Sequence, residues 1–175
     1  MNTSFLPNIK NIKAFTLLEL LIYTAILSGV VVMISSSFIS LSKGRAQAQA
    51  RGEVNSALRF STERIRQDIK NASLVTVPAM GASSSTLSLT VSGVSVVYSS
   101  ASGQLLRKEG AIATTSLNNT STVFASLPLF TVKGNYNAVT NSTTTLIQLL
   151  LTYSYAASSS DWKYTDTLRT TVGLR

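Results

Sequence analysis

A single carboxylate stands in an uncharged, apolar stretch close to the N-terminus. Glu19 is the only charged residue between Ala14 and Ser42. A carboxylate within a bilayer costs about 2.5–3.5 kcal/mol on insertion scales, so Glu19 is a candidate functional group. It lies four residues after Phe15, one turn along the same face of a helix. A cut between Ala14 and Phe15 would create an α-amine, a natural ion-pair partner for this carboxylate.

The stretch that surrounds Glu19 is long enough to cross a membrane. Residues 15–34 are dominated by apolar side chains, and about 20 such residues span about 30 Å as a helix. Lys10 and Lys13 precede them, which places the N-terminus in the cytoplasm and the remaining chain outside. The alternative is a cleaved secretory signal. The apolar region of such a signal has roughly 7–15 residues and is shorter than the stretch present in this chain. We therefore expect a retained, single-pass anchor.

The segment AFTLLEL, residues 14–20, follows a short leader that carries lysines. It resembles the class III signal of type IV pilins and type II secretion pseudopilins. The resemblance implies that prepilin peptidase removes residues 1–14 and N-methylates Phe15. It also implies that Glu19 pairs with the terminal amine of a neighbouring subunit during filament assembly. Ala14 departs from the glycine that is commoner before the cut.

Beyond the span, the apolar residues recur at helical spacing. Residues 43–77 are expected to form the amphipathic half of the helix that begins in the span at residues 15–42. No proline interrupts residues 15–77, so one helix of about 60 residues, near 90 Å, is expected. The stretch 71–78 is expected to end it, because the β-branched residues 75–77 favour an extended chain and the residue before Pro78 avoids the helical region. The expected buried stripe is Val54, Ala57, Leu58, Ile65, Ile69 and Ala72.

Residues 78–175 alternate apolar and polar positions, which predicts an antiparallel β-rich head. The expected strands are 86–92, 94–98, 104–108 and 144–155, with loops at 116–121 and 133–137. The unbroken leucines 149–151 predict a central strand that is covered on both faces. The predicted fold class is α+β, pilin-like, with the helix packed on the head. In that core Leu87, Leu89, Tyr98, Leu149, Leu151, Trp162 and Leu168 pack against Val54, Leu58, Ile65 and Ile69.

Looser motifs narrow the resemblance within the pilin family. A hairpin at 96–107, the helix end at 64–72 and the closing residues 171–175 resemble minor pilins of the W type and pseudopilins of the J type. The chain has no cysteine pair near its C-terminus and no proline in the span. Major pilins of the type IVa class usually have both, so the resemblance implies a minor subunit.

The composition excludes several kinds of chemistry. The chain has no cysteine and no histidine. Disulfides, thiolate nucleophiles, Cys/His zinc sites and histidine-based triads are therefore excluded. No glycine-rich phosphate loop is present either. We expect no catalysis, no cofactor and no metal.

The net charge of +8 raises the question of nucleic-acid binding, because clustered cations attract phosphate. The cations of the second half of the helix alternate with Glu53, Glu63 and Asp68, and no aromatic platform lies among them. This pattern is more typical of a solvated or subunit-facing helix. Nucleic acid is therefore an unlikely partner.

The resemblance implies a structural subunit of a type IV pilus or type II secretion pseudopilus. Its implied partners are other subunits, prepilin peptidase, the assembly platform protein with its ATPase, and inner-membrane lipid. The implied location is the bacterial inner membrane with the head extracytoplasmic, then a surface filament. The alternatives are a signal-anchored extracytoplasmic binding module and a competence pilin for DNA uptake.

Overall fold

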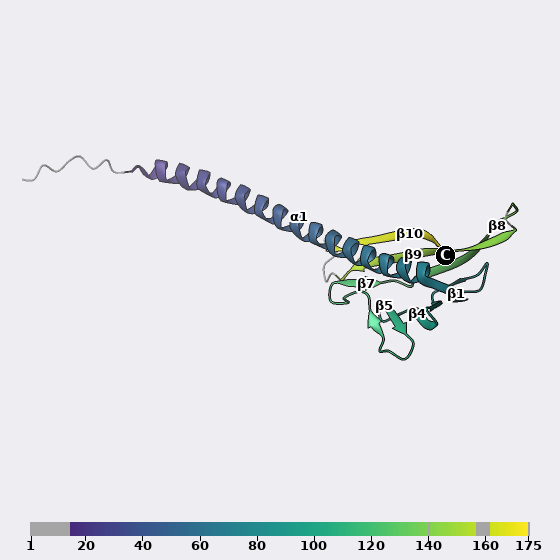
Figure 1. Cartoon of the computed structure of the whole chain (residues 1–175). Coiled ribbons are helices and arrows are strands. Elements are labelled where there is room, and N and C mark those ends of the chain that lie inside the picture. Colours follow the sequence, from purple (N-terminus) through teal and green to yellow (C-terminus); the bar gives the residue numbers. More distant parts are fainter. Residues whose placement is uncertain (1–14, 140, 157–161, 175) are drawn as a thin grey trace, which may run out of the picture. The chain divides into compact units, whose positions relative to one another are not determined.

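The computed structural model describes residues 15–139, 141–156 and 162–174. The chain divides into two compact units, with the boundary between Ser42 and Lys43. Helix α1 (Leu17–Asn71) runs from the first unit into the second. Among the described residues, the second unit adds ten strands, all of which pair antiparallel. The predicted α+β class, with one long apolar helix and antiparallel sheet, is confirmed (Figure 1).

Helix α1 changes character along its length. Its part in the first unit exposes apolar side chains throughout, whereas its part in the second unit buries one stripe. The stripe recurs every three or four residues, as expected for one face of a helix. Its members are Ala50, Val54, Leu58, Ser61, Ile65, Asp68 and Ile69. The helix ends at Asn71 and not at residue 77, because the β-branched residues that follow form strand β1 (Ala72–Val77).

The first sheet contains five strands in the order β1-β3-β4-β5-β6. Two of its hairpins are closed by two-residue turns, Ser92-Gly93 and Ser102-Gly103, in which both residues have positive φ. This is the type I′ geometry whose twist matches the flanking strands. The strands after β1 are β3 (Leu87–Val91), β4 (Val94–Ala101), β5 (Gln104–Glu109) and β6 (Thr115–Ser116).

The second sheet has the order β10-β9-β8-β2, and β7 pairs with the far end of β9. Its strands are β2 (Ser83–Ser84), β7 (Val123–Ala125), β8 (Leu129–Asn137), β9 (Ser142–Tyr155) and β10 (Thr165–Gly173). The expected loop at 133–137 is wrong, because these residues extend β8 and pair with residues 142–146. Strand β9 is paired with β10 at one edge and with β8 at the other. Buried and half-buried side chains alternate along it, so one of its faces is less covered than the other. The expectation that both faces are covered is therefore wrong.

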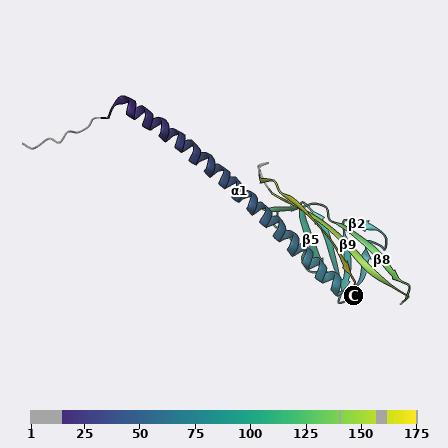
Figure 2. The same ribbon diagram turned by 90° about the horizontal axis from the view of Figure 1, so that it is seen from above.

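Both sheets share one core with the buried stripe of α1. In two views that differ by 90°, the second half of the helix lies along the sheets (Figures 1 and 2). The predicted core residues Leu87, Leu89, Tyr98, Leu149 and Leu151 are buried, as are their four helix partners. Leu168 is half-buried against the same core. Trp162 is 41 % exposed, contrary to expectation, because it precedes the first residue of β10 and has no inward-facing strand position.

Candidate functional site

The N-terminal end of α1 contains Glu19 and the residues that start the helix. The Glu19 backbone N–H donates to Thr16 Oγ1 at 3.2 Å, and the Leu20 N–H donates to the Thr16 carbonyl oxygen at 3.2 Å. Thr16 is thus the N-cap, and Glu19 is the third helical residue. Thr-x-x-Glu is the pattern of a capping box, and a carboxylate there also interacts favourably with the helix dipole. Our sequence reasoning missed this local role, although Thr16 and Glu19 carried its signal.

Phe15 lies before the helix, and its side chain is 75 % exposed. Since the helix begins only after its N-cap Thr16, Phe15 is not part of it. The expectation that Phe15 and Glu19 share a helix face is therefore wrong. Ala14 and the rest of the expected leader, residues 1–14, lie outside the described residues. A terminal amine on Phe15 would stand next to the cap, and both Phe15 and Glu19 are accessible to another molecule.

The remainder of the first unit is an apolar helical surface without protein cover. Helix α1 includes a window of 18 residues apolar enough to cross a membrane, and none of this window is buried. Length and composition therefore make it a possible membrane anchor. Large exposed side chains include Leu17, Leu21, Ile26, Val31, Ile34 and Phe38.

Several serine and threonine hydroxyls of this surface are satisfied within the helix. Ser35 Oγ donates to the Val31 carbonyl at 2.8 Å, and Ser40 Oγ donates to the Ser36 carbonyl at 3.0 Å. Thr24 and Ser28 make equivalent bonds to carbonyls three residues earlier. Hydroxyls bonded in this way need no partner from outside, so they are compatible with lipid or with an apolar protein neighbour.

A buried ionic cluster joins the second half of α1 to the first sheet. Asp68 is 5 % exposed, and its Oδ2 accepts from the Tyr98 hydroxyl at 2.5 Å and from Arg107 Nε at 2.7 Å. Arg107 Nη1 also donates to Glu109 Oε2 at 2.6 Å. Burial, together with the neighbouring Asp68 carboxylate, raises the pKa of Tyr98 far above its usual range. Asp68 was expected among the solvated charges of the helix, and this is wrong.

A second buried contact joins the helix to the other sheet. Ser61 Oγ lies 2.7 Å from the Tyr153 hydroxyl oxygen, and both residues are buried. Burial raises the pKa of Tyr153 to about 12, although the bond to Ser61 works in the opposite direction. The two contacts occupy the helix stripe at Ser61 and Asp68, so they hold the helix against both sheets.

The second unit also contains an open groove next to the ionic cluster. Across the described ranges, no group of three or more Asp, Glu, His or Cys residues could hold a metal ion. An open groove of about 380 Å³ lies beside the ionic cluster, lined in part by Phe60, Arg64, Arg107 and Leu117. The carboxylates of Asp68 and Glu109 are already engaged with Arg107 there.

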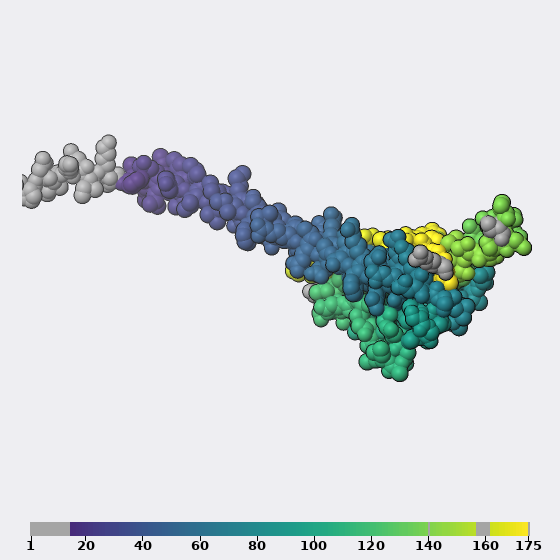
Figure 3. Space-filling model, viewed as in Figure 1, coloured from purple at the N-terminus to yellow at the C-terminus, as the bar shows by residue number. Residues whose placement is uncertain are grey.

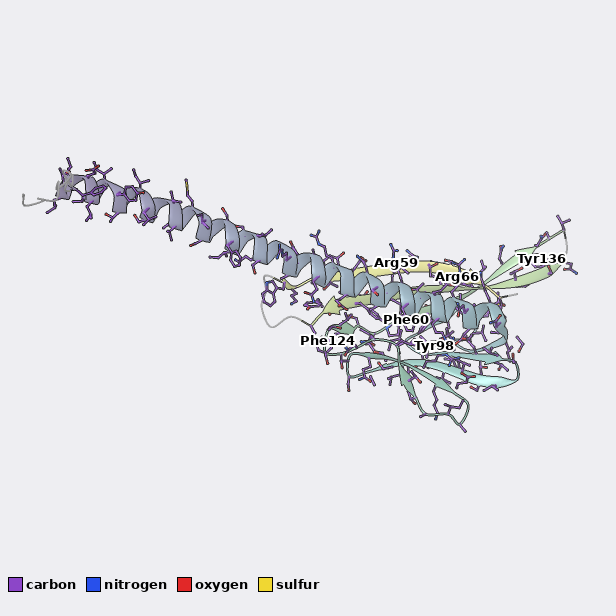
Figure 4. All side chains as sticks on the ribbon, turned by 60° about the vertical axis from the view of Figure 1, so that its left-hand side comes forward. Arg59, Phe60, Arg66, Tyr98, Phe124 and Tyr136 are labelled. Carbon is purple, nitrogen blue, oxygen red and sulfur yellow. The ribbon has the colours of Figure 1, made fainter. Side chains whose placement is uncertain are left out.

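The outer face of the second half of α1 is polar and accessible. Arg59 and Arg66 are exposed on it (Figure 4). The space-filling view shows the surface of this part of the helix next to the sheets (Figure 3). Arg66 Nη1 lies 3.8 Å from Glu63 Oε2, and both side chains are about half-exposed. An exposed pair of this kind contributes at most about 1 kcal/mol to stability. The mixture of signs on this face agrees with a solvated or subunit-facing helix.

No protein-family model matches the sequence, and no curated protein or solved structure is significantly similar to it.

Proposed function

We propose that the chain is a minor pilin or pseudopilin, a structural subunit that leaves the bacterial inner membrane to join a filament. The single observation that carries this proposal is Glu19, the lone charge of residues 15–42, which include the uncovered apolar part of α1. A helix used only as an anchor gains nothing beyond support of its first turn from a carboxylate in its apolar segment. A helix that must pair with a neighbour does gain from one.

Processing would precede assembly. Prepilin peptidase would cut between Ala14 and Phe15 and would N-methylate the new terminus on Phe15. The exposed position of Phe15, outside the helix, supports access of an enzyme to this bond. Removal of Lys10 and Lys13 takes away the cations that hold this end of the precursor at the cytoplasmic surface.

Assembly would exchange lipid contacts for helix–helix contacts. The platform protein and its ATPase would extract the subunit, and the apolar part of α1 would pack among equivalent helices in the filament core. The hydroxyls of Thr24, Ser28, Ser35 and Ser40 are already bonded within the helix. The exchange therefore leaves these four hydroxyls paired. Pairing of Glu19 with the amine of another subunit would offset the burial of both charges.

The capping geometry of Glu19 favours a second candidate, a membrane-anchored extracytoplasmic binding module. In this alternative, the Glu19 carboxylate would serve only the start of the helix, where Thr16 Oγ1 accepts from the Glu19 backbone N–H. The β-rich second unit would then act alone at the cell surface. The alternative requires no cleavage before Phe15 and no neighbouring subunit.

Substitutions at Glu19 distinguish the two candidates. Glu19→Gln keeps a side chain that suits a capping box but removes the charge, whereas Glu19→Ala removes both. For a filament subunit, both variants should insert and be cleaved normally, yet be lost from sheared surface filaments. The loss should be at least about 100-fold, because breaking a buried pair costs about 3–5 kcal/mol. Glu19→Asp should give an intermediate amount.

The measurements are intact mass of the chain with and without prepilin peptidase, and immunoblotting of sheared filaments. Cleavage before Phe15 with a mass increase of one methyl group is the expected result. If Glu19→Gln enters filaments like the unchanged chain while Glu19→Ala does not, capping is its role and the ion pair is refuted. A mature chain that starts beyond Ile34 would refute the proposal itself.

A further inference from the structure

One end of the second unit carries exposed aromatic side chains. Strand β7 pairs with the last residues of β9, and this places Phe124 opposite Ser154. On the other side of β9, the Tyr155 N–H donates to the Tyr164 carbonyl oxygen at 2.8 Å, two residues after Trp162. Phe124 is 44 % exposed and Trp162 is 41 % exposed. Figure 4 shows Phe124 at the end of this unit that lies away from Tyr136.

The start of the second unit's helical segment lies at the same end. The Arg51 guanidinium carbon is 5.6 Å from the centre of the Tyr164 ring, a cation–π distance. Ala50 is the first residue of α1 that the sheets bury. It follows Lys43, where this unit begins, by seven residues, or about 10 Å of helix. Lys43 and Arg45 therefore follow the apolar segment directly in the sequence.

The segments that contribute to this end are rich in cations. Residues 43–53 and 162–164 contain Lys43, Arg45, Arg51 and Lys163, all exposed, against one carboxylate, Glu53. We call Phe124, Trp162, Lys163, Arg45 and Arg51 the basal patch. Aromatic rings with a polar edge favour the membrane–water interface. Lysine and arginine close to a membrane surface are attracted by anionic lipid headgroups.

We propose that the basal patch binds the headgroups of anionic phospholipids while the chain is still anchored in the membrane. The proposal rests on the membrane-anchored precursor of the proposed function. Trp162 and Phe124 would enter the interfacial layer, and Arg45, Arg51 and Lys163 would contact phosphates. This interaction explains why a large aromatic residue next to β10 is left outside the core. Extraction into a filament would require its release.

Trp162 is the only tryptophan of the chain, so its fluorescence reports on the patch without labelling. The uncleaved chain is reconstituted at low density into phosphatidylcholine vesicles, with or without about a third phosphatidylglycerol. Part of the phosphatidylcholine carries bromine atoms high on the acyl chains, where they quench a tryptophan at the interface. We expect a blue-shifted emission and strong quenching in the anionic vesicles. Both effects should weaken as salt screens the charges.

Matched variants test the chemistry of the contact. The double variant Arg45→Gln, Lys163→Gln should lower the equilibrium constant for contact between the patch and the lipid about five-fold for each cation removed. Arg59→Gln with Arg66→Gln removes the same charge from exposed positions farther along the helix (Figure 4). This control pair should leave the quenching unchanged. All four residues are exposed, so neither pair should disturb the core.

Three outcomes would overturn the proposal. The first is quenching that is the same with and without phosphatidylglycerol. The second is an equal loss in the two variant pairs, which would indicate non-specific attraction. The third is a Trp162 signal that follows protein density and not lipid composition, which would assign the patch to another copy of the chain. The assay needs neither cleavage nor filaments, so its failure is distinguishable from failure of Glu19 variants to assemble.

Discussion

Replacement of Asp68 by alanine should destabilise the second unit more than any surface change on the same helix. Asp68 connects α1 to the first sheet through two bonds to one carboxylate oxygen, from Tyr98 and from Arg107. Both donors have little solvent access, since Tyr98 is fully buried and the Arg107 side chain is 12 % exposed. Asp68→Ala leaves the Tyr98 hydroxyl and one guanidinium N–H without these acceptors.

The expected loss of unfolding free energy depends on which hydrogen bonds remain in each variant. Removing one partner of a buried ion pair costs about 3–5 kcal/mol. Arg107 keeps its 2.6 Å bond to Glu109, so we expect about 3 kcal/mol, at the lower end. Tyr98→Phe removes a single hydrogen bond to a charged group and should cost about 1.5–3 kcal/mol. Glu109→Gln acts at a side chain that is 39 % exposed and should cost at most about 1 kcal/mol.

The assay is urea unfolding of the detergent-solubilised chain, followed by circular dichroism in the near ultraviolet. Arg59→Ala is the matched control, because it removes an exposed charge from the same helix and should change stability by less than about 0.5 kcal/mol. The double variant of Asp68 and Tyr98 should be less unstable than the sum of the two single variants. If Asp68→Ala costs no more than Arg59→Ala, the cluster does not hold the helix to the sheet, and our reasoning fails.

Two further predictions concern the same unit. Ile65→Ala truncates a fully buried side chain of the helix stripe and should cost about 2–5 kcal/mol in the same unfolding assay; unchanged unfolding with Ile65→Asp would refute the packing. Tyr153 has its pKa raised from 10.0 to about 12 in the folded chain, so its stabilising contribution is complete below pH 10 and declines as the pH rises towards 12. Tyr153→Phe removes this dependence, and the difference should reach about 2–3 kcal/mol; parallel stability curves for the two chains above pH 10 would contradict it.

Local pattern was sufficient for the long helix and for several strands of this fold. Twenty apolar residues and the helical spacing after them predicted α1, because helix formation and one-sided burial both leave a periodic trace in sequence. The alternating apolar and polar positions of β3 and β4 predicted these two strands. Glu19 was identified because a charge in an apolar run is conspicuous without any structure. Its capping partner, Thr16, was also within reach, three residues away.

Only the tertiary structure decided which polar groups are buried and which large side chain is not. Asp68 looks like any surface charge between Gln67 and Ile69, because its burial depends on Tyr98 and Arg107, which come from strands 30 and 39 residues away. Trp162 has a large, mostly apolar side chain of the kind that favours a core. The pairing of β10 with β9 starts only at Thr165, so Trp162 lies beyond the end of the paired strand. The type of a residue indicates whether its side chain favours burial or exposure. Whether the side chain is buried depends on the distant residues that strand pairing brings next to it.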